Sequence, residues 1–70
     1  MPKIKFLRLK LGLTQGHVAT ALGVHQPDLS AFELMTRRPG PIWQKRFSDF
    51  YGLPWESLAG TVDLNDFKLA

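Results

Sequence analysis

The 70-residue sequence contains no cysteine, which excludes a disulfide framework and any metal site built on thiolates. It has no apolar run near the roughly 20 residues that a membrane-spanning helix needs. The first residues lack the apolar stretch and cleavage site of a secretory signal, so we expect a cytoplasmic protein without membrane association. Without a covalent staple, a chain this short must gain stability from close helix packing, from a second copy, or from both.

Arrangements typical of an enzyme are missing as well. We find no paired carboxylates beside a histidine, no nucleophile with a neighbouring base and no glycine-rich phosphate loop. His17 and His25 are eight residues apart and, in the absence of cysteine, form a poor metal site. The sequence therefore predicts no catalytic activity, no metal and no cofactor.

Acidic residues are scarce in the first two-thirds of the chain. Residues 1–46 hold eight lysines and arginines but only two acidic residues, whereas residues 47–70 hold one lysine and four acidic residues. A basic surface of this kind favours a polyanionic partner. Ordinary solvated lysines and arginines are the alternative, and charge alone does not decide between the two.

The alternation typical of strands is also absent, and the apolar spacing predicts helices throughout. A first helix over residues 2–11 has an apolar stripe formed by Ile4, Leu7 and Leu11. Gly12 ends this helix at the position that favours a left-handed backbone. Phe6 and Leu9 lie off the stripe, so they are either exposed or covered by another part of the chain.

The next two helices are short and closely spaced. Thr14 caps the start of the second helix, and Gly23 ends it. Gln26-Pro27-Asp28 reads as the first turn of the third helix, because proline is tolerated where no intrahelical N–H bond is made. The core-facing residues of the two helices are Val18, Ala19, Leu22, Leu29 and Phe32. Two short helices joined by three residues around a glycine describe a helix-turn-helix.

Two further helices are predicted after a loop rich in proline and glycine. Pro41 begins the fourth helix, and Gly52 ends it. Its core-facing stripe consists of Trp43, Phe47, Phe50 and Tyr51. A short fifth helix over residues 54–58 turns Trp55 and Leu58 inward.

Several short runs carry information through their order and spacing. They are Gly12-Leu13-Thr14-Gln15, Val18-Ala19, Leu22-Gly23-Val24, Gln26-Pro27-Asp28-Leu29-Ser30, Phe32-Glu33 and the stretch from Tyr51 to Leu58. In these runs the chain resembles the Cro/C1-type (Xre) helix-turn-helix family of phage repressors and bacterial regulators. The resemblance implies an all-α, lambda-repressor-like domain of five helices over residues 1–60, with the helix-turn-helix at the second and third. It also implies binding of double-stranded DNA, usually as a homodimer.

By this resemblance the third helix enters the major groove with its first residues against the base edges. The implied base contacts are Gln26, Pro27, Ser30 and Ala31. Gln26 can pair with adenine through its amide, whereas Pro27 and Ala31 can touch only thymine methyl groups or sugars. Asp28 would repel phosphates, so we expect it to satisfy first-turn N–H groups, with acceptance from cytosine N4 as the alternative.

The implied contacts to the DNA backbone surround this helix, and they are Gln15, His25, Arg37, Arg38 and Lys45. Gln15 would bond a phosphate at the start of the second helix. His25 is either a phosphate contact or a plain turn residue. Because the third helix contains no lysine or arginine, the loop arginines and Lys45-Arg46 must supply the positive charge.

Arg8 and Glu33 have a structural role by the same resemblance, as a buried ion pair that joins the first and third helices. After Glu33 the sequence departs from the family, which has a polar residue and a glycine where this chain has Leu34-Met35-Thr36. Either the third helix continues, or Leu34 and Met35 form an apolar contact surface.

The tail, residues 61–70, lies outside the resemblance. Its apolar residues include Leu64, Phe67 and Leu69. They either pack onto Phe6 and Leu9 of the first helix or contact a second subunit. A two-fold dimer would place the third helices about 34 Å apart and read a near-palindromic operator.

Three functions remain open at this point. The first is a sequence-specific transcription regulator, a repressor of the Cro or C1 type. The second is an antitoxin that binds operator DNA and a toxin, because the run from Gln26 to Ser30 also resembles antitoxins of this superfamily. In that case Leu34, Met35 or the tail would contact the toxin. The third is a protein-binding helix-turn-helix, which the uncharged third helix favours and the basic first two-thirds opposes.

Overall fold

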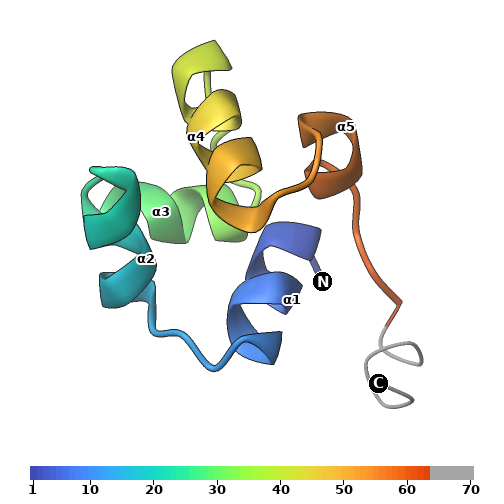
Figure 1. The fold of residues 1–70 in the computed structure, drawn as a ribbon, viewed down its shortest axis with the longest axis horizontal. Coiled ribbons are helices and arrows are strands. Elements are labelled where there is room, and N and C mark those ends of the chain that lie inside the picture. The colour runs from blue at the N-terminus through green and yellow to red at the C-terminus, as the bar shows by residue number, and fades with distance from the viewer. Residues whose placement is uncertain (64–70) are drawn as a thin grey trace.

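The computed structural model describes residues 1–63. In this range the chain forms a small domain of five helices and no strand, which confirms the expected all-α architecture. The helices are α1 (Lys3–Lys10), α2 (Gln15–Leu22), α3 (Gln26–Glu33), α4 (Pro41–Tyr51) and α5 (Trp55–Leu58). Figure 1 shows α2 and α3 at one side of the domain and α5 at the other, with α4 above α1 between them. Within the described range, no helix combines the length and apolar character that crossing a bilayer requires.

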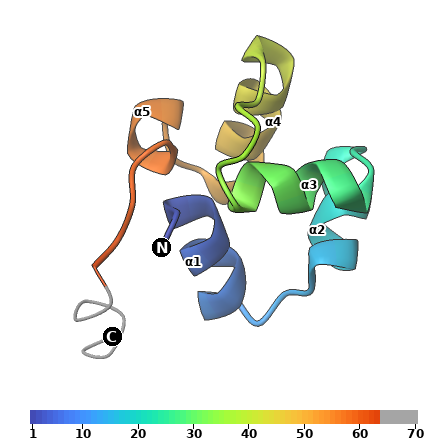
Figure 2. The ribbon, with the colours of Figure 1, turned by 180° about the vertical axis from the view of Figure 1, so that it is seen from behind.

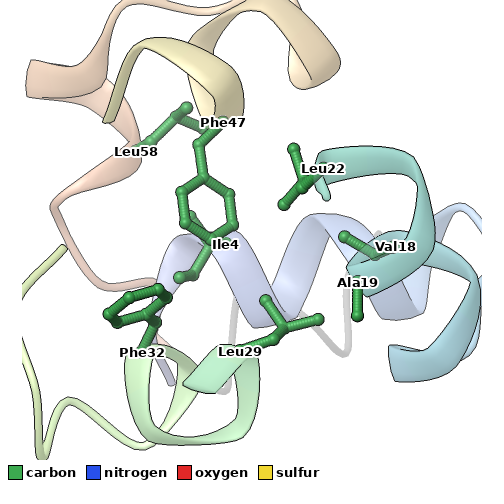
Figure 3. Close-up of a cluster of buried hydrophobic side chains, with 8 residues drawn as sticks. All are labelled: Ile4, Val18, Ala19, Leu22, Leu29, Phe32, Phe47 and Leu58. Carbon is green, nitrogen blue, oxygen red and sulfur yellow. The ribbon is translucent and has the colours of Figure 1, made fainter. Parts of the chain in front are cut away.

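The core is a cluster of buried side chains to which every helix contributes (Figure 3). Its members are Ile4, Val18, Ala19, Leu22, Leu29, Phe32, Phe47 and Leu58. Phe47 extends from α4 into the middle of the cluster and meets the Phe32 ring edge-on, with centroids 6.1 Å apart. Burying one side chain of this size contributes about 1.5–3 kcal/mol, so helices that are marginal alone become stable together.

The aromatic stripe of α4 packs inward as predicted, but to different depths. Phe47 is 1% exposed, whereas Trp43, Phe50 and Tyr51 are half-buried against the edge of the core. In α5, Leu58 is fully buried and Trp55 lies beside Phe47, with ring centroids 5.9 Å apart.

The apolar stripe predicted for the first helix is wrong at its end. Leu11 is 60% exposed, whereas Phe6, which lies off the predicted stripe, is buried. Leu11 is the C-cap of α1 and its N–H still bonds the Leu7 carbonyl, so its exposure means that the packed face of the helix does not extend to this end. Leu9 is exposed, and the ammonium group of Lys10 lies 5.7 Å from the centroid of the Phe6 ring.

The end of α2 follows the sequence prediction. The N–H of Gly23 bonds the carbonyl of Thr20, and the N–H of Val24 bonds the carbonyl of Ala19. This pair of bonds is a Schellman motif, which needs a left-handed residue at its turn. Gly23 supplies it with a φ of 72°.

The end of α3 has the same pair of bonds with a different residue at the turn. The N–H of Met35 bonds the carbonyl of Phe32, and the N–H of Thr36 bonds the carbonyl of Ala31. Met35 has a φ of 61°, the one positive value at a residue other than glycine in the described range. Since α3 ends at Glu33, the alternative of a longer third helix is wrong.

The start of the chain is bonded to the segment that follows α5. Met1 and Val62 exchange two backbone hydrogen bonds of 3.2 and 2.8 Å, around a single antiparallel bridge between Pro2 and Thr61. Figure 2 shows this segment running down past the start of α1. Outside the described residues lie the apolar tail residues Leu64, Phe67 and Leu69, whose predicted packing stays a prediction.

Replacing Met35 by glycine should stabilise the domain, because a left-handed backbone costs a residue with a Cβ roughly 1–2 kcal/mol. We expect the free energy of unfolding in urea to rise by about 0.5–1 kcal/mol, since glycine also makes the unfolded chain more flexible. Met35→Ala keeps the Cβ and serves as the matched control, with a change below about 0.5 kcal/mol. Equal stability of the two variants would contradict backbone strain at this turn.

Candidate nucleic-acid interface

The Gln26 side chain reaches from the first turn of α3 to the first turn of α2, and this meeting point is the centre of the candidate site. The Thr14 hydroxyl accepts a 3.1 Å hydrogen bond from the N–H of His17, so Thr14 caps α2 as predicted. A methyl group on Gly16 would lie 3.7 Å from Oε1 of Gln26 and 4.0 Å from Oγ1 of Thr14. The amide of Gln26, the first residue of α3, therefore lies beside the first turn of α2.

Behind these turns, a buried network centres on the Glu33 carboxylate, which is 1% exposed. The Arg8 guanidinium donates from Nε to Oε2 at 2.7 Å and from Nη2 to Oε1 at 3.0 Å, so the ion pair implied by the resemblance is present. Nη1 of Arg8 donates to the Leu13 carbonyl at 2.9 Å. The network thus joins α1, the segment before α2, and α3.

Gln15 belongs to the same network, which changes its expected role. Its Nε2 donates a 3.0 Å hydrogen bond to Oε1 of Glu33. The side chain is therefore held toward the protein instead of extending freely toward a phosphate. As the first residue of α2, Gln15 still places its backbone N–H at the positive end of that helix.

The outward face of α3 carries the residues that the sequence assigned to base contacts. Gln26 and Pro27 are exposed, and Ser30 and Ala31 are partly exposed. His25 is the exposed N-cap of α3, and its side chain makes no capping hydrogen bond. Leu29, Phe32 and Glu33 occupy the opposite face and are buried, so α3 divides into a core face and a free face.

Asp28 and Arg37 have a contact that the sequence reasoning missed. Nη1 of Arg37 donates to Oδ1 of Asp28 at 2.8 Å, and the guanidinium carbon lies 5.5 Å from the centroid of the Phe32 ring. Asp28 was expected to satisfy first-turn N–H groups, but its carboxylate instead pairs with a cation from beyond the end of the helix. No helical spacing reveals this pair, because the chain leaves the helix between the two residues.

The basic residues around α3 differ in how freely they extend. Arg38 and Lys45 are exposed, and in the described part of the chain neither takes part in a hydrogen bond or an ion pair. Arg46 instead donates from Nη1 to the Leu22 carbonyl at 2.8 Å and lies 4.8 Å from the centroid of Trp43. It stabilises the C-terminus of α2, whereas the spacing of Trp43 and Arg46 on one helix indicates only their mutual contact.

Two apolar side chains are exposed directly after α3. Leu34 is 62% exposed, and Met35 is 58% exposed. Met35 also borders a groove of about 270 Å³ between α1, the end of α3 and α5. The groove is lined by residues that include Ile4, Phe32, Pro39, Trp55 and Leu58. Leu34 and Met35 are thus exposed apolar residues, and their role as a contact surface stays a prediction.

Two buried polar atoms of α4 and α5 have no hydrogen-bond partner in the described structure, Oη of Tyr51 and Nε1 of Trp55. Burial raises the pKa of Tyr51 to about 12, and the negative charge of Glu33 adds to the shift. The phenol is therefore neutral over the whole physiological range and carries no acid–base chemistry there.

Among the residues that the structure describes, no three histidine, aspartate or glutamate side chains gather in a way that would hold a metal ion. No protein-family model matches the chain, and comparison with curated proteins and with solved structures finds no significant match.

Removing one partner of the central ion pair should strongly destabilise the domain. Arg8→Met leaves the buried Glu33 carboxylate uncompensated, and we expect a loss of about 3–5 kcal/mol in the free energy of unfolding. The double variant Arg8→Met, Glu33→Leu should recover most of this loss, because it removes both charges. Arg38→Met, at an exposed site, is the control and should change stability by less than about 0.5 kcal/mol. A double variant no more stable than Arg8→Met would contradict this account.

The unpartnered hydroxyl of Tyr51 predicts an unusual response to alkaline pH. The pKa of about 12 lies above that of tyrosine in an unfolded chain, so the stability contributed by the neutral phenol is complete below about pH 10 and is lost as the pH rises toward 12. Tyr51→Phe should lose less unfolding free energy than the parent between about pH 8 and 11. At neutral pH the variant should be equally stable or up to about 1 kcal/mol more stable. Identical pH profiles for both chains would contradict the burial of this group.

Proposed function

We propose that the chain binds double-stranded DNA and regulates transcription, with α2 and α3 acting as a helix-turn-helix and α3 lying in the major groove. The observation that carries the proposal is the reach of the Gln26 side chain from the start of α3 to the first turn of α2. It brings the Gln26 amide, free on the outer face, next to the helix N-terminus that begins at Gln15. A base-reading amide beside a phosphate-binding N-terminus is the combination that groove recognition uses.

The rigidity of this arrangement supports the proposal. The Glu33 carboxylate holds Arg8 of α1 and Gln15 of α2 while it sits on α3 itself. Because an unpaired buried charge is costly, the three helices keep one relative position. Base contacts require such preorganisation, since a misplaced side chain cannot form paired hydrogen bonds to a base edge.

Phosphate contacts in this proposal come from the helix termini and the free cations. The DNA backbone is contacted by the N–H of Gln15, the N-cap residue His25, and the side chains of Arg38 and Lys45. The bases are contacted by Gln26, Pro27, Ser30 and Ala31. With so few cations, one domain binds weakly, and a homodimer on a near-palindromic operator doubles the contact. The two copies of α3 would then lie about 34 Å apart.

A direct test is fluorescence anisotropy of a labelled random duplex at increasing salt. We expect binding at about 50 mM salt that weakens steeply toward about 200 mM, with a linear fall of log K against log salt concentration. Selection from a random duplex library then supplies the preferred site. No affinity for any duplex at low salt would refute the proposal.

Two variants separate base reading from backbone contact. Gln26→Ala should lose about 1–3 kcal/mol at a single base position of the selected site and leave binding to random DNA nearly unchanged. Arg38→Ala should weaken binding to all sequences alike and reduce the salt slope by about 1. Equal losses for Gln26→Ala on every duplex would contradict its role at the base edge.

A second candidate function is favoured by Leu34 and Met35. Their exposure, and the strained backbone that holds Met35 outward, are typical of a surface that contacts a protein partner. An antitoxin-type protein would use α3 for DNA and this surface for a toxin. A chain that binds only protein would show no affinity for duplex DNA, whereas a transcription regulator and an antitoxin would both bind the duplex.

A further inference from the structure

The ion pair between Asp28 and Arg37 spans the free flank of α3. Asp28 lies in the first turn of the helix, and Arg37 lies beyond its C-terminal end. Their side chains are 39% and 57% exposed, and the 2.8 Å bond holds the guanidinium folded back over Phe32. The pair is therefore accessible to solvent and to any ligand that α3 contacts.

Asp28 carries the one exposed carboxylate of α3, and this contact pairs it with the Arg37 guanidinium. That guanidinium is a cation able to bind a DNA phosphate. While the pair is closed, the two charges cancel, and Arg37 offers little attraction to a phosphate. Exposed ion pairs contribute little to stability and exchange readily, so a phosphate can replace Asp28 as the partner of Arg37. The exchange leaves the Asp28 carboxylate unpaired beside a polyanion, and this opposes binding.

One base changes that balance. A carboxylate in the major groove can accept a hydrogen bond from the N4 amino group of cytosine. Where cytosine meets the first turn of α3, both members of the opened pair find a new partner. At any other base an opened pair would leave the carboxylate without a partner, so Asp28 keeps Arg37 as its partner.

We infer that Asp28 is a specificity-determining residue, which withholds Arg37 from the phosphates of non-cognate DNA and releases it where cytosine takes its place. This inference rests on the proposed function, because it requires α3 to lie in the major groove. It gives the chain a second base-reading residue besides Gln26.

The test compares the parent chain with Asp28→Asn, which keeps the shape and removes the charge. On random duplex DNA we expect Asp28→Asn to bind about two- to fivefold more tightly, the range that one exposed ion pair covers. Its salt slope should steepen by about 1, because Arg37 is free to neutralise one more phosphate. Site selection with the variant should lose the preference for cytosine at one position. Asp28→Ser also removes the charge and should behave in the same way. Circular dichroism of both variants checks that neither has a folding defect.

Glu56→Gln is the matched control, because it raises the net charge by the same amount from an exposed position on α5. It should leave the salt slope unchanged. The steeper slope of Asp28→Asn should disappear when Arg37→Gln is added. If the parent binds duplex DNA but Asp28→Asn shows neither tighter binding to random sequence nor a steeper slope, the inference is wrong and the proposed function stands. If the parent binds no duplex at low salt, both are wrong.

Discussion

The buried carboxylate of Glu33 is the constraint on which the arrangement of the domain depends. It accepts two hydrogen bonds from Arg8 and one from Gln15, and Arg8 also reaches the Leu13 carbonyl. Such a charge is tolerated in the interior only while all its partners stay in place. Three short helices, each too short to be stable alone, are therefore held in one mutual orientation. The position of the Gln26 amide beside the first turn of α2 is a consequence of that orientation.

Three of the nine lysines and arginines are engaged in polar contacts within the protein. Arg8 neutralises Glu33, Arg46 stabilises the C-terminus of α2, and Arg37 pairs with Asp28. Only part of the formal charge is therefore available to a polyanion at the candidate interface. Under the proposed function, recognition then depends on a few well-placed contacts, and a second copy of the domain would add to the affinity.

The end of α3 departs most from an unstrained helix terminus. The two backbone hydrogen bonds that close α3 are those of a Schellman motif, in which glycine usually occupies the left-handed position. Here Met35 occupies that position, and Leu34 beside it is exposed. Backbone strain persists where the surrounding structure or a function requires that side chain. The same turn directs the chain so that Arg37 returns to Asp28, which links the strained turn to the proposed specificity of α3.

The sequence by itself determined where α2 and α4 begin and end, because Thr14, Gly23, Pro41 and Gly52 act on the backbone next to them. It also determined most of the core, since apolar residues at helical spacing must share a face, and the resemblance supplied the pair of Arg8 and Glu33. Tertiary structure alone decided the hydrogen-bond partners of Gln15, Asp28, Arg37 and Arg46. It also decided that Phe6 is buried and Leu11 exposed. Those outcomes depend on how separate helices cross and where the chain turns back, and no local spacing encodes a contact between segments that the fold brings together.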